Sequence, residues 1–376
     1  MREVLLTEIC DIQYGFAFDS ALFSESEGVP LVRIRDVVRG FSETYTKEPF
    51  PAEYEVQDGD ILIGMDGEFN IAKWNGGKAA LNQRVCKLIP QAVDSGYIFY
   101  FMPIALKKIE EKTPFVTVKH LSAKELNKIY VPLPSMVQQK AIAQTLDKVN
   151  ELISLRKKQL QKLDDLVKSR FVEMFAKHNE RIVPLKTICI KGPQNGFYRK
   201  GAEINGTIPI MKMKQLFGNE SMSEAHDCDL VALTKTELER FLLTQNDLLF
   251  GRRSLVVEGA GKCRRVGRIT TQAVFESSML RVTLDATKVK PRYLQIWFNS
   301  EEGKNAISSI RAVTTIAGIK GSDLANVEVP VAPIALQEEF LEFVGQCDRS
   351  KLTIQKSLDK LELLKQSLMQ TYFGDK

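Results

Sequence analysis

The residues of this chain with the most suggestive chemistry are basic and amide side chains in glycine-bearing loops. Arginine can read guanine through two hydrogen bonds, asparagine and glutamine can read adenine, and lysine and serine can hold phosphates. Each residue alone is equally well explained as a solvated surface position, but the same mixture occurs in both halves of the chain. We therefore interpret the set as a nucleic-acid contact surface. The predicted contact residues are Arg33, Arg35, Lys73, Trp74, Asn75, Lys78, Asn82, Gln83 and Arg84 in the first half, and Lys212, Lys214, Arg252, Arg253, Ser254, Lys262, Arg264, Arg265 and Arg268 in the second half.

The candidate motifs for catalysis or metal binding do not have the residues that such motifs need at the required spacing. The segment Gly259–Arg265 resembles a phosphate-binding loop, but such a loop needs Gly where Val256 stands and Ser or Thr where Cys263 stands. His226 and Cys228 have no second ligand pair at a spacing that zinc would use. The sequence also lacks the Asn-Pro-Pro-aromatic motif of adenine methyltransferases. We therefore expect a chain that is not an enzyme and that binds no metal or cofactor itself.

The length and composition are typical of a chain with two or three domains. It has 376 residues, of which 44% are hydrophobic and 26% charged. The net charge of +5 indicates a mild preference for anionic partners. Six scattered cysteines without a Cys-x-x-Cys pair indicate reduced thiols. Because no apolar run approaches the length of a membrane span and no signal peptide is recognisable, we expect a cytoplasmic protein without membrane contact.

Strands, loops and helices follow in the same order in both halves, which predicts an α+β fold. In the first half, the pattern predicts strands at Leu31–Val37, Ile61–Ile63 and Arg84–Ile89, a helix at Tyr97–Glu111, and a short helix opened by the capping box Ser122–Glu125. In the second half, it predicts strands at Pro209–Lys214, Asp247–Gly251 and Met279–Leu284 and a helix at Tyr293–Phe298.

A long amphipathic helix is predicted at the end of each half, over Gln138–Phe175 and Gln337–Phe373. In the first of them, apolar residues recur at alternating spacings of four and three, which is typical of a coiled-coil seam. The first helix would be about 57 Å long. Charged residues such as Arg156 and Lys351 interrupt the seams. We therefore expect the two helices to pair with each other rather than to form a homodimer; the alternative is two unrelated amphipathic helices.

The two halves of the chain are related to each other. A single shift of 198 residues superimposes the long helices without a gap and pairs Gln139 with Gln337. Val4 matches Val183 at a shift of 179 residues, so the shift changes only before the helices, where loops take up insertions. The chain is predicted to be a tandem duplication whose second copy begins near Arg181.

The sequence resembles the specificity subunits of type I restriction-modification systems over essentially its whole length. The segments that carry the resemblance are Gly28–Val37, Gly59–Phe69, Asn82–Val85, Val131–Asp147, Phe250–Leu255 and Gly259–Cys263. The Pro-Leu-Pro junction within Val131–Asp147 is the most diagnostic of these segments. The chain departs from the common pattern at Gln138, where many members have Glu, and at its second junction, VPVAPIALQEE.

The resemblance implies a tandem repeat of two mixed α/β target-recognition domains. Each domain would be followed by a long conserved helix, and the two helices would pair as an antiparallel coiled coil. The expected boundaries are residues 1–137 for the first target-recognition domain, 138–180 for the central helix and linker, 181–336 for the second domain, and 337–376 for the C-terminal helix.

The resemblance also implies a role in defence against foreign DNA. Each domain would read one half of a bipartite, asymmetric site in double-stranded DNA, and the helices would fix the spacing between the halves. The implied partners are two modification (methyltransferase) subunits and the restriction/translocase subunits. S-adenosylmethionine, ATP and magnesium are expected on these partners and not on this chain. A specificity subunit for a stand-alone methyltransferase-endonuclease, or a coiled-coil scaffold that does not bind DNA, stays open as an alternative.

Overall fold

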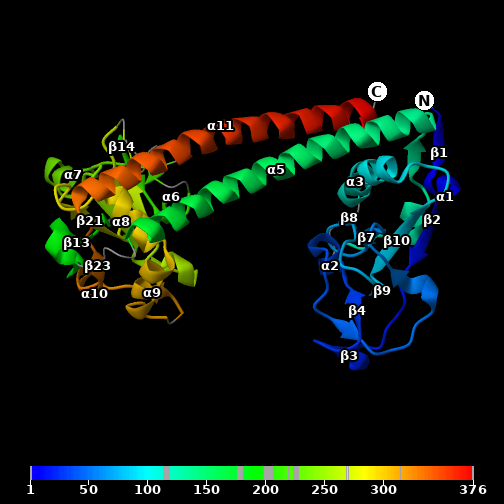
Figure 1. Ribbon diagram of the computed structural model, residues 1–376, viewed down its shortest axis with the longest axis horizontal. Helices are drawn as coiled ribbons and strands as arrows, with labels where there is room; N and C mark the ends of the chain where they lie inside the picture. The colour runs from blue at the N-terminus through cyan, green and yellow to red at the C-terminus, as the bar shows by residue number, and fades with distance from the viewer. Residues whose placement is uncertain are drawn as a thin grey trace. The chain divides into compact units, whose positions relative to one another are not determined.

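The chain folds into two compact units, each of which combines sheets and helices (Figure 1). The computed structural model describes residues 2–112, 119–175, 181–198, 206–218, 221–222, 228–267, 269, 271–313 and 315–374. Unit 1 comprises Met1–Lys158 and Gln355–Lys376, and unit 2 comprises Gln159–Ile354. The predicted mixture of helices and sheets, together with the long helices, is confirmed.

The described part of unit 1 contains a four-stranded sheet and a five-stranded sheet, besides a pair of short strands. In the order in which they pair, the strands of the first sheet are β2 (Cys10–Tyr14), β10 (Val85–Pro90), β7 (Ile61–Gly64) and β8 (Ile71–Lys73). Those of the second sheet are β3 (Phe23–Ser24), β5 (Tyr45–Thr46), β4 (Val29–Val32), β9 (Ala79–Leu81) and β6 (Glu55–Val56). Neighbours in the first sheet are antiparallel, whereas β4 and β9 in the second sheet run parallel.

The other elements of unit 1 cover these sheets and lead into the first long helix. They are β1 (Glu3–Leu5), α1 (Leu6–Ile9), α2 (Ile34–Arg39), α3 (Ser95–Lys112), α4 (Ala123–Leu126), β11 (Tyr130–Pro132) and the 3-10 turns Ser20–Leu22 and Ala52–Tyr54. As predicted, Ser122 caps α4 by accepting the N–H of Glu125. The pairing of β1 with β11 ties the start of the chain to the segment directly before the long helix.

Strand β7 is buried on both of its faces because it lies between two apolar clusters. Ile61 and Ile63 pack in the cluster that contains Phe101 of α3. Leu62, which points the other way, packs with Trp74. This burial on two faces accounts for the unbroken apolar run in the sequence.

Unit 2 has sheets of five and three strands, and a two-stranded pair beside them. The five-stranded sheet consists, in pairing order, of β13 (Cys189–Asn195), β21 (Met279–Leu284), β17 (Asp247–Gly251), β19 (Cys263–Val266) and β15 (Ser221–Met222). The smaller ones are β16 (Asp229–Val231), β14 (Ile208–Met211) and β20 (Val274–Phe275), and β18 (Arg253–Ser254) with β22 (Ala317–Gly318). Strand β14 runs parallel to β20, as β4 does to β9 in unit 1.

The remaining elements of unit 2 repeat the arrangement around the buried strand. They are β12 (Ile182–Pro184), α6 (Met213–Leu216), α7 (Lys235–Phe241), α8 (Pro291–Phe298), α9 (Glu301–Ser309), α10 (Gly321–Ala325), β23 (Glu328–Pro330) and the 3-10 turns Leu185–Ile188 and Val257–Gly259. β12 pairs with β23 just as β1 pairs with β11. Leu248 and Phe250 of β17 pack in one apolar cluster and Leu249 in another.

The two long helices are α5 (Met136–Phe175) and α11 (Ile334–Phe373), with 40 residues each. They begin two and three residues before the predicted starts and end at the predicted residues. At 1.5 Å per residue each is about 60 Å long. Such helices need tertiary contacts, because isolated helices gain little stability from propensity alone.

A buried glutamine anchors the first turn of α5 in unit 1. The side chain of Gln139 is 2% exposed. Its Oε1 accepts the backbone N–H of Asp94 at 2.8 Å, and its Nε2 donates to the carbonyl of Pro134 at 2.9 Å. The amide therefore joins three segments: the helix, the extended junction before it and the loop before α3.

The equivalent glutamine anchors α11 in unit 2 by the same bonds. Gln337 is fully buried. Its Oε1 accepts the N–H of Lys290 at 2.8 Å, and its Nε2 donates to the carbonyl of Ala332 at 2.7 Å. The shift of 198 residues that pairs the two glutamines also pairs Pro134 with Ala332. The sequence match is therefore also a match of hydrogen bonds.

Each long helix ends on an aromatic cluster. Phe373 of α11 is buried in unit 1 against Tyr97, with ring centres 5.2 Å apart. Phe175 of α5 is buried in unit 2 against Tyr293, with ring centres 4.9 Å apart. Each such aromatic pair stabilises the fold by about 0.5–1.5 kcal/mol more than the burial of its apolar surface alone.

Ion pairs join the two long helices within each unit. In unit 1, Lys157 of α5 lies 3.2 Å from Glu362 of α11. In unit 2, Lys351 of α11 pairs with Asp164 of α5. Lys351 is one of the charged residues that interrupt the predicted seam, so this interruption has a partner on the other helix.

Two predicted strands were too long. Leu31–Val37 and Pro209–Lys214 were expected to be strands, but β4 ends at Val32 and β14 at Met211, and the chain then turns into α2 and α6. The physical cause is a cap formed at the turn. The carboxylate of Asp36 accepts the N–H of Arg33 at 3.0 Å, and the amide of Gln215 does the same for Lys212.

We expect the anchoring glutamines to be required for stability. Gln139→Leu keeps the volume but leaves the N–H of Asp94 and the carbonyl of Pro134 unpaired in a buried place. The free energy of unfolding should fall by about 1–3 kcal/mol. Urea unfolding of the purified chain measures this, with exposed Gln144→Leu on the same helix as the matched control. Equal stability of the two variants would contradict the anchoring role.

Candidate nucleic-acid interface

In unit 1, several chain segments emerge at one edge of the sheets. Because β4 and β9 run parallel with Val32 opposite Leu81, Arg33 and Asn82 follow side by side. The last residue of β7, Gly64, lies opposite the first residue of β10, so Arg84 is at the same place. We call this edge 1. It contains five of the predicted contact residues, namely Arg33, Arg35, Asn82, Gln83 and Arg84.

Most of the edge 1 side chains are accessible. Arg33, Arg35, Gln83 and Arg84 are exposed, and Asn82 is half-buried. Arg35 donates to the hydroxyl of Thr44 at 3.2 Å, so its guanidinium is held in place. These are the charge-bearing and amide-bearing side chains that contacts to phosphates and base edges require.

Gly64 lets the start of α2 approach the end of β7. A Cβ on Gly64 would lie 3.1 Å from Cγ2 of Ile34, which allows little room for a side chain. In unit 2, a Cβ on Gly251 would lie 3.2 Å from the methyl carbon of Met213 in α6, and 2.0 Å from the carbonyl oxygen of Gly259. In both units a glycine therefore brings the cation-bearing helix start against the end of the buried strand.

Four predicted residues of unit 1 lie away from edge 1. Lys73 is opposite Ile61, at the other end of β7, and its ammonium group lies 5.1 Å from the centre of the Phe99 ring. Lys78 pairs with Glu55 at 3.1 Å. Asn75 belongs to the same loop and is exposed.

The fourth of these residues, Trp74, is a correction. Its side chain is 1% exposed and packs in the apolar cluster below β7. The indole N–H donates to the carbonyl of Gly77 at 2.7 Å. A ring buried in this way shapes the loop and cannot stack on a base or contact a phosphate.

Unit 2 has an equivalent edge. Because β14 and β20 run parallel with Met211 opposite Phe275, Lys212 and Glu276 follow side by side. Strand β17 ends at Gly251, so the next residues extend from the same place. We call this edge 2. It contains the predicted contact residues Lys212, Lys214, Arg252, Arg253, Ser254 and Lys262.

The cations of edge 2 differ in how firmly they are held. Arg252 donates to the carbonyl of Ser277 at 3.2 Å, whereas Arg253 is exposed. Lys212 forms an ion pair with Asp229. The ammonium group of Lys262 lies 4.4 Å from the centre of the Phe217 ring, and burial, helped by the charge of Arg264, lowers its pKa.

The other predicted residues of unit 2 are not at edge 2. Arg264 and Arg265 lie in the middle of β19. Arg264 lines a cavity of about 490 Å³ together with Arg292 of α8, and the backbone N–H of Arg265 donates to the side chain of Gln295 at 3.0 Å. Arg268 lies outside the described residues.

The sequence reasoning missed two acidic residues at these edges because it searched for cations and amides. Glu276 of edge 2 accepts the N–H of Met213 at 2.8 Å, which fixes the start of α6. Asp66, beside edge 1, pairs with Arg84 at 3.5 Å. Glu276 directly follows β20, which the sequence analysis did not predict, and Asp66 is the second residue after β7.

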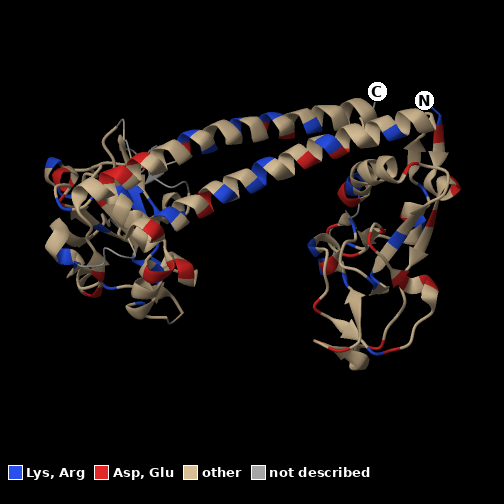
Figure 2. Cartoon of the chain, viewed as in Figure 1, with Lys and Arg blue, Asp and Glu red and all other residues tan. Residues whose placement is uncertain are grey.

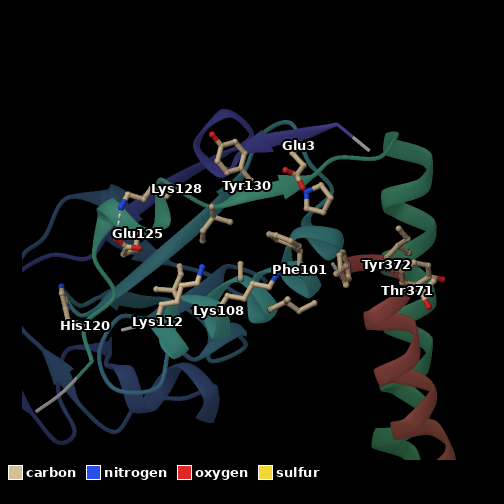
Figure 3. A pocket seen from close by; sticks show the side chains of 18 residues that line it. Glu3, Phe101, Lys108, Lys112, His120, Glu125, Lys128, Tyr130, Thr371 and Tyr372 are labelled. Atoms are coloured by element: carbon tan, nitrogen blue, oxygen red, sulfur yellow. Dashed lines mark hydrogen bonds and ion pairs between the residues drawn. The ribbon is translucent and has the colours of Figure 1, made fainter. Parts of the chain in front are cut away.

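A cavity of unit 1 lies apart from edge 1. It measures about 1050 Å³ and lies between α3, the segment around β11 and the end of α11 (Figure 3). Figure 3 shows Phe101, Lys108 and Lys112 on its α3 side and Tyr372 at its α11 side. None of the predicted contact residues lines it.

The described residues contain no group of three or more His, Cys, Asp or Glu side chains placed to hold a metal ion. No helix in the described part of the chain combines the length and the apolar character needed to cross a lipid bilayer. Along the long helices, Figure 2 shows basic and acidic residues mixed, without a continuous band of one sign.

Comparison with known proteins finds similarity to one family. Residues 1–165 match the family model described as "Type I restriction modification DNA specificity domain". The chain is 27% identical to the specificity subunit of the type I restriction enzyme EcoBI of Escherichia coli, over 98% of this chain and 85% of that protein. It is 21% identical to the EcoKI specificity subunit of Escherichia coli K12, over 93% of this chain and 83% of that protein.

Solved structures share the fold. The S subunit of a type I restriction-modification system from M. genitalium has a TM-score of 0.58 to this chain, with 13% identity, over 100% of this chain and 96% of that one. A chain from a structural study of type I complex assembly also has a TM-score of 0.58, with 16% identity, over 99% of this chain and 97% of that one. In sequence, over residues 1–165 for the family model and over most of its length for the curated relatives, the chain is similar to the specificity subunits of type I restriction-modification systems.

Proposed function

We propose that this chain is the non-catalytic, DNA-reading subunit of a type I restriction-modification complex, and that unit 1 and unit 2 each read one half of a bipartite, asymmetric site. The observation that carries the proposal is the recurrence of the cation-bearing edge. In both units, a cation follows the end of one of two parallel strands and occupies the N-cap position of a short helix, as Arg33 and Lys212 do. The similarity to type I DNA specificity subunits points to DNA as the partner of these edges.

The proposal includes a tandem duplication of the chain. Its support is that equivalent residues make equivalent contacts in both units. Gln139 and Gln337 anchor the long helices by equivalent hydrogen bonds. Gly64 and Gly251 leave room for the first residues of α2 and α6, respectively. This is consistent with target-recognition domains at residues 1–137 and 181–336 and with conserved helices at 138–180 and 337–376.

We assign two tasks to the edges. Exposed cations such as Arg33 and Arg253 would hold phosphates and supply affinity that weakens with salt. Side chains fixed by hydrogen bonds, such as Arg35 and Arg252, would be better suited to read bases, because less conformational freedom is lost when they bind. The edges carry different residues, which suits an asymmetric target.

We assign the long helices a spacing role, as an antiparallel coiled coil. A helix of 40 residues is stiff, and its length changes only by insertion or deletion. The ion pairs Lys157–Glu362 and Asp164–Lys351 support the pairing of the helices. In this proposal, two modification subunits bind the chain and carry S-adenosylmethionine, while restriction/translocase subunits carry ATP and magnesium.

A methylation map tests the proposed function. The chain is co-expressed with the modification subunit encoded next to it, in a host without other adenine methyltransferases. We expect a split, asymmetric methylation motif that is absent when the modification subunit is expressed alone, because the chain supplies the sequence preference. The two proteins assembling without any new motif would contradict a DNA-reading role.

The spacing role predicts a change of spacer without a change of half-sites. Deleting the equivalent heptads 155–161 and 353–359 shortens each helix by about 10 Å, which corresponds to about three base pairs of DNA. The methylation map should show the same half-sites with a shorter spacer. Deleting only one of the heptads is the control and should abolish methylation. An unchanged spacer combined with altered half-sites would refute this role.

Edge 2 predicts a loss of DNA binding. Arg252→Ala with Arg253→Ala should weaken binding of the assembled complex to its methylated motif by about tenfold or more, and should reduce the salt dependence by about 0.9 per lost phosphate contact. The control removes the same charge at the opposite end of unit 2, by Lys186→Ala with Lys288→Ala. Wild-type binding that does not respond to salt would instead favour the scaffold alternative.

A further inference from the structure

Beside edge 1, the side chains of Arg84 and His120 both contact the carboxylate of Asp66. One of its oxygens, Oδ1, lies 2.5 Å from Nδ1 of His120, and the other, Oδ2, lies 3.5 Å from Nε of Arg84. The side chain of Asp66 is 22% exposed, whereas those of His120 and Arg84 are 50% and 54% exposed. Asp66 is therefore the inner member of the group, and Arg84 extends towards solvent.

The backbone fixes this arrangement. The N–H of Met65 donates to the carbonyl of Arg84 at 3.0 Å, and the carbonyl of Met65 accepts the N–H of Leu121 at 2.7 Å. Asp66 and His120 form a further antiparallel bridge. Three segments that are distant in the sequence are thus held in register, and the side-chain contacts follow from that register.

The geometry leaves the reading end of Arg84 available. Arg84 approaches Asp66 through Nε, and within the described residues neither of its terminal nitrogens donates a hydrogen bond. Two parallel N–H groups of a planar guanidinium are what the O6 and N7 acceptors of guanine require in the major groove. A carboxylate behind the guanidinium fixes its plane and so reduces the conformational freedom lost on binding.

We propose that Asp66, held in turn by His120, is a positioning residue that aims Arg84 at a guanine in the half-site read by unit 1. This inference rests on the proposed function and adds a base and a residue to it. The half-site read by unit 1 therefore contains a guanine whose recognition depends on a residue that does not itself touch the base.

Unit 2 cannot form this arrangement. Asp66 is the second residue after Gly64, and the second residue after Gly251 is Arg253. Arg84 directly precedes β10, and Ser278 directly precedes the equivalent strand β21. Changes in the group around Asp66 should therefore affect one half-site and leave the other unchanged.

The test is the methylation map of the assembled complex with variants of unit 1. Arg84→Lys keeps the charge but loses the planar pair of donors, so it should reduce the preference for guanine at one position of one half-site by about tenfold or more. Asp66→Asn should reduce the same preference by a few-fold, and Asp66→Glu should restore part of it. The matched control is Asp60→Asn, which removes an Asp from an ion pair at the other end of β7 and should leave the motif unchanged.

Three results would overturn the inference: a wild-type motif without guanine in either half, an unchanged guanine preference in Arg84→Lys, or an Asp66→Asn variant that lowers methylation at all sites equally. The last result would mark Asp66 as a structural residue only. Thermal unfolding of each variant shows whether it is folded. Failure of the proposed function looks different, because the wild-type chain would then give no split motif at all.

Discussion

The buried glutamine at the start of each long helix is the interaction on which the rest of the structure depends. A helix of 40 residues amplifies any change in the direction of its first turn. Gln139 and Gln337 fix that direction because each amide uses both its oxygen and its nitrogen on backbone groups of its own unit. An apolar residue could fill the same space, but it would specify no orientation and would leave buried backbone groups unpaired.

The far ends of the helices are fixed by packing rather than by hydrogen bonds. Phe373 and Phe175 each enter an aromatic cluster of the unit in which their helix ends. Polar anchoring at one end and apolar anchoring at the other suit a helix whose middle is largely solvated. The charged residues in the middle, such as Lys157 and Lys351, add partners on the other helix. Each such pair at the surface contributes little to stability but can select one register.

The edges show how one scaffold can carry two different surfaces. In both units, two parallel strands end side by side, and a short helix follows one of them. A glycine leaves room for the start of this helix, and a polar side chain caps it. The residues placed on that frame differ: Asp66 and Arg84 beside edge 1 correspond to Arg253 and Ser278 in unit 2. Because the frame is held by backbone pairing and buried apolar residues, the exposed side chains can vary at small cost in stability.

The sequence by itself determined the two long helices, the buried strands and the similarity to type I specificity subunits. These features can be recognised in the sequence itself, from the constant shift of 198 residues between the long helices and from unbroken apolar runs such as Ile61–Ile63. Only the tertiary structure decided which cations gather at an edge. The run Leu31–Val37 fits a strand by its alternation, yet the cap made by Asp36 turns the chain into a helix after Val32. Trp74 looks like a contact residue in its loop but is buried, since its surroundings come from residues far away in the sequence. Short patterns fit more than one local structure, and the contacts that choose between them are non-local.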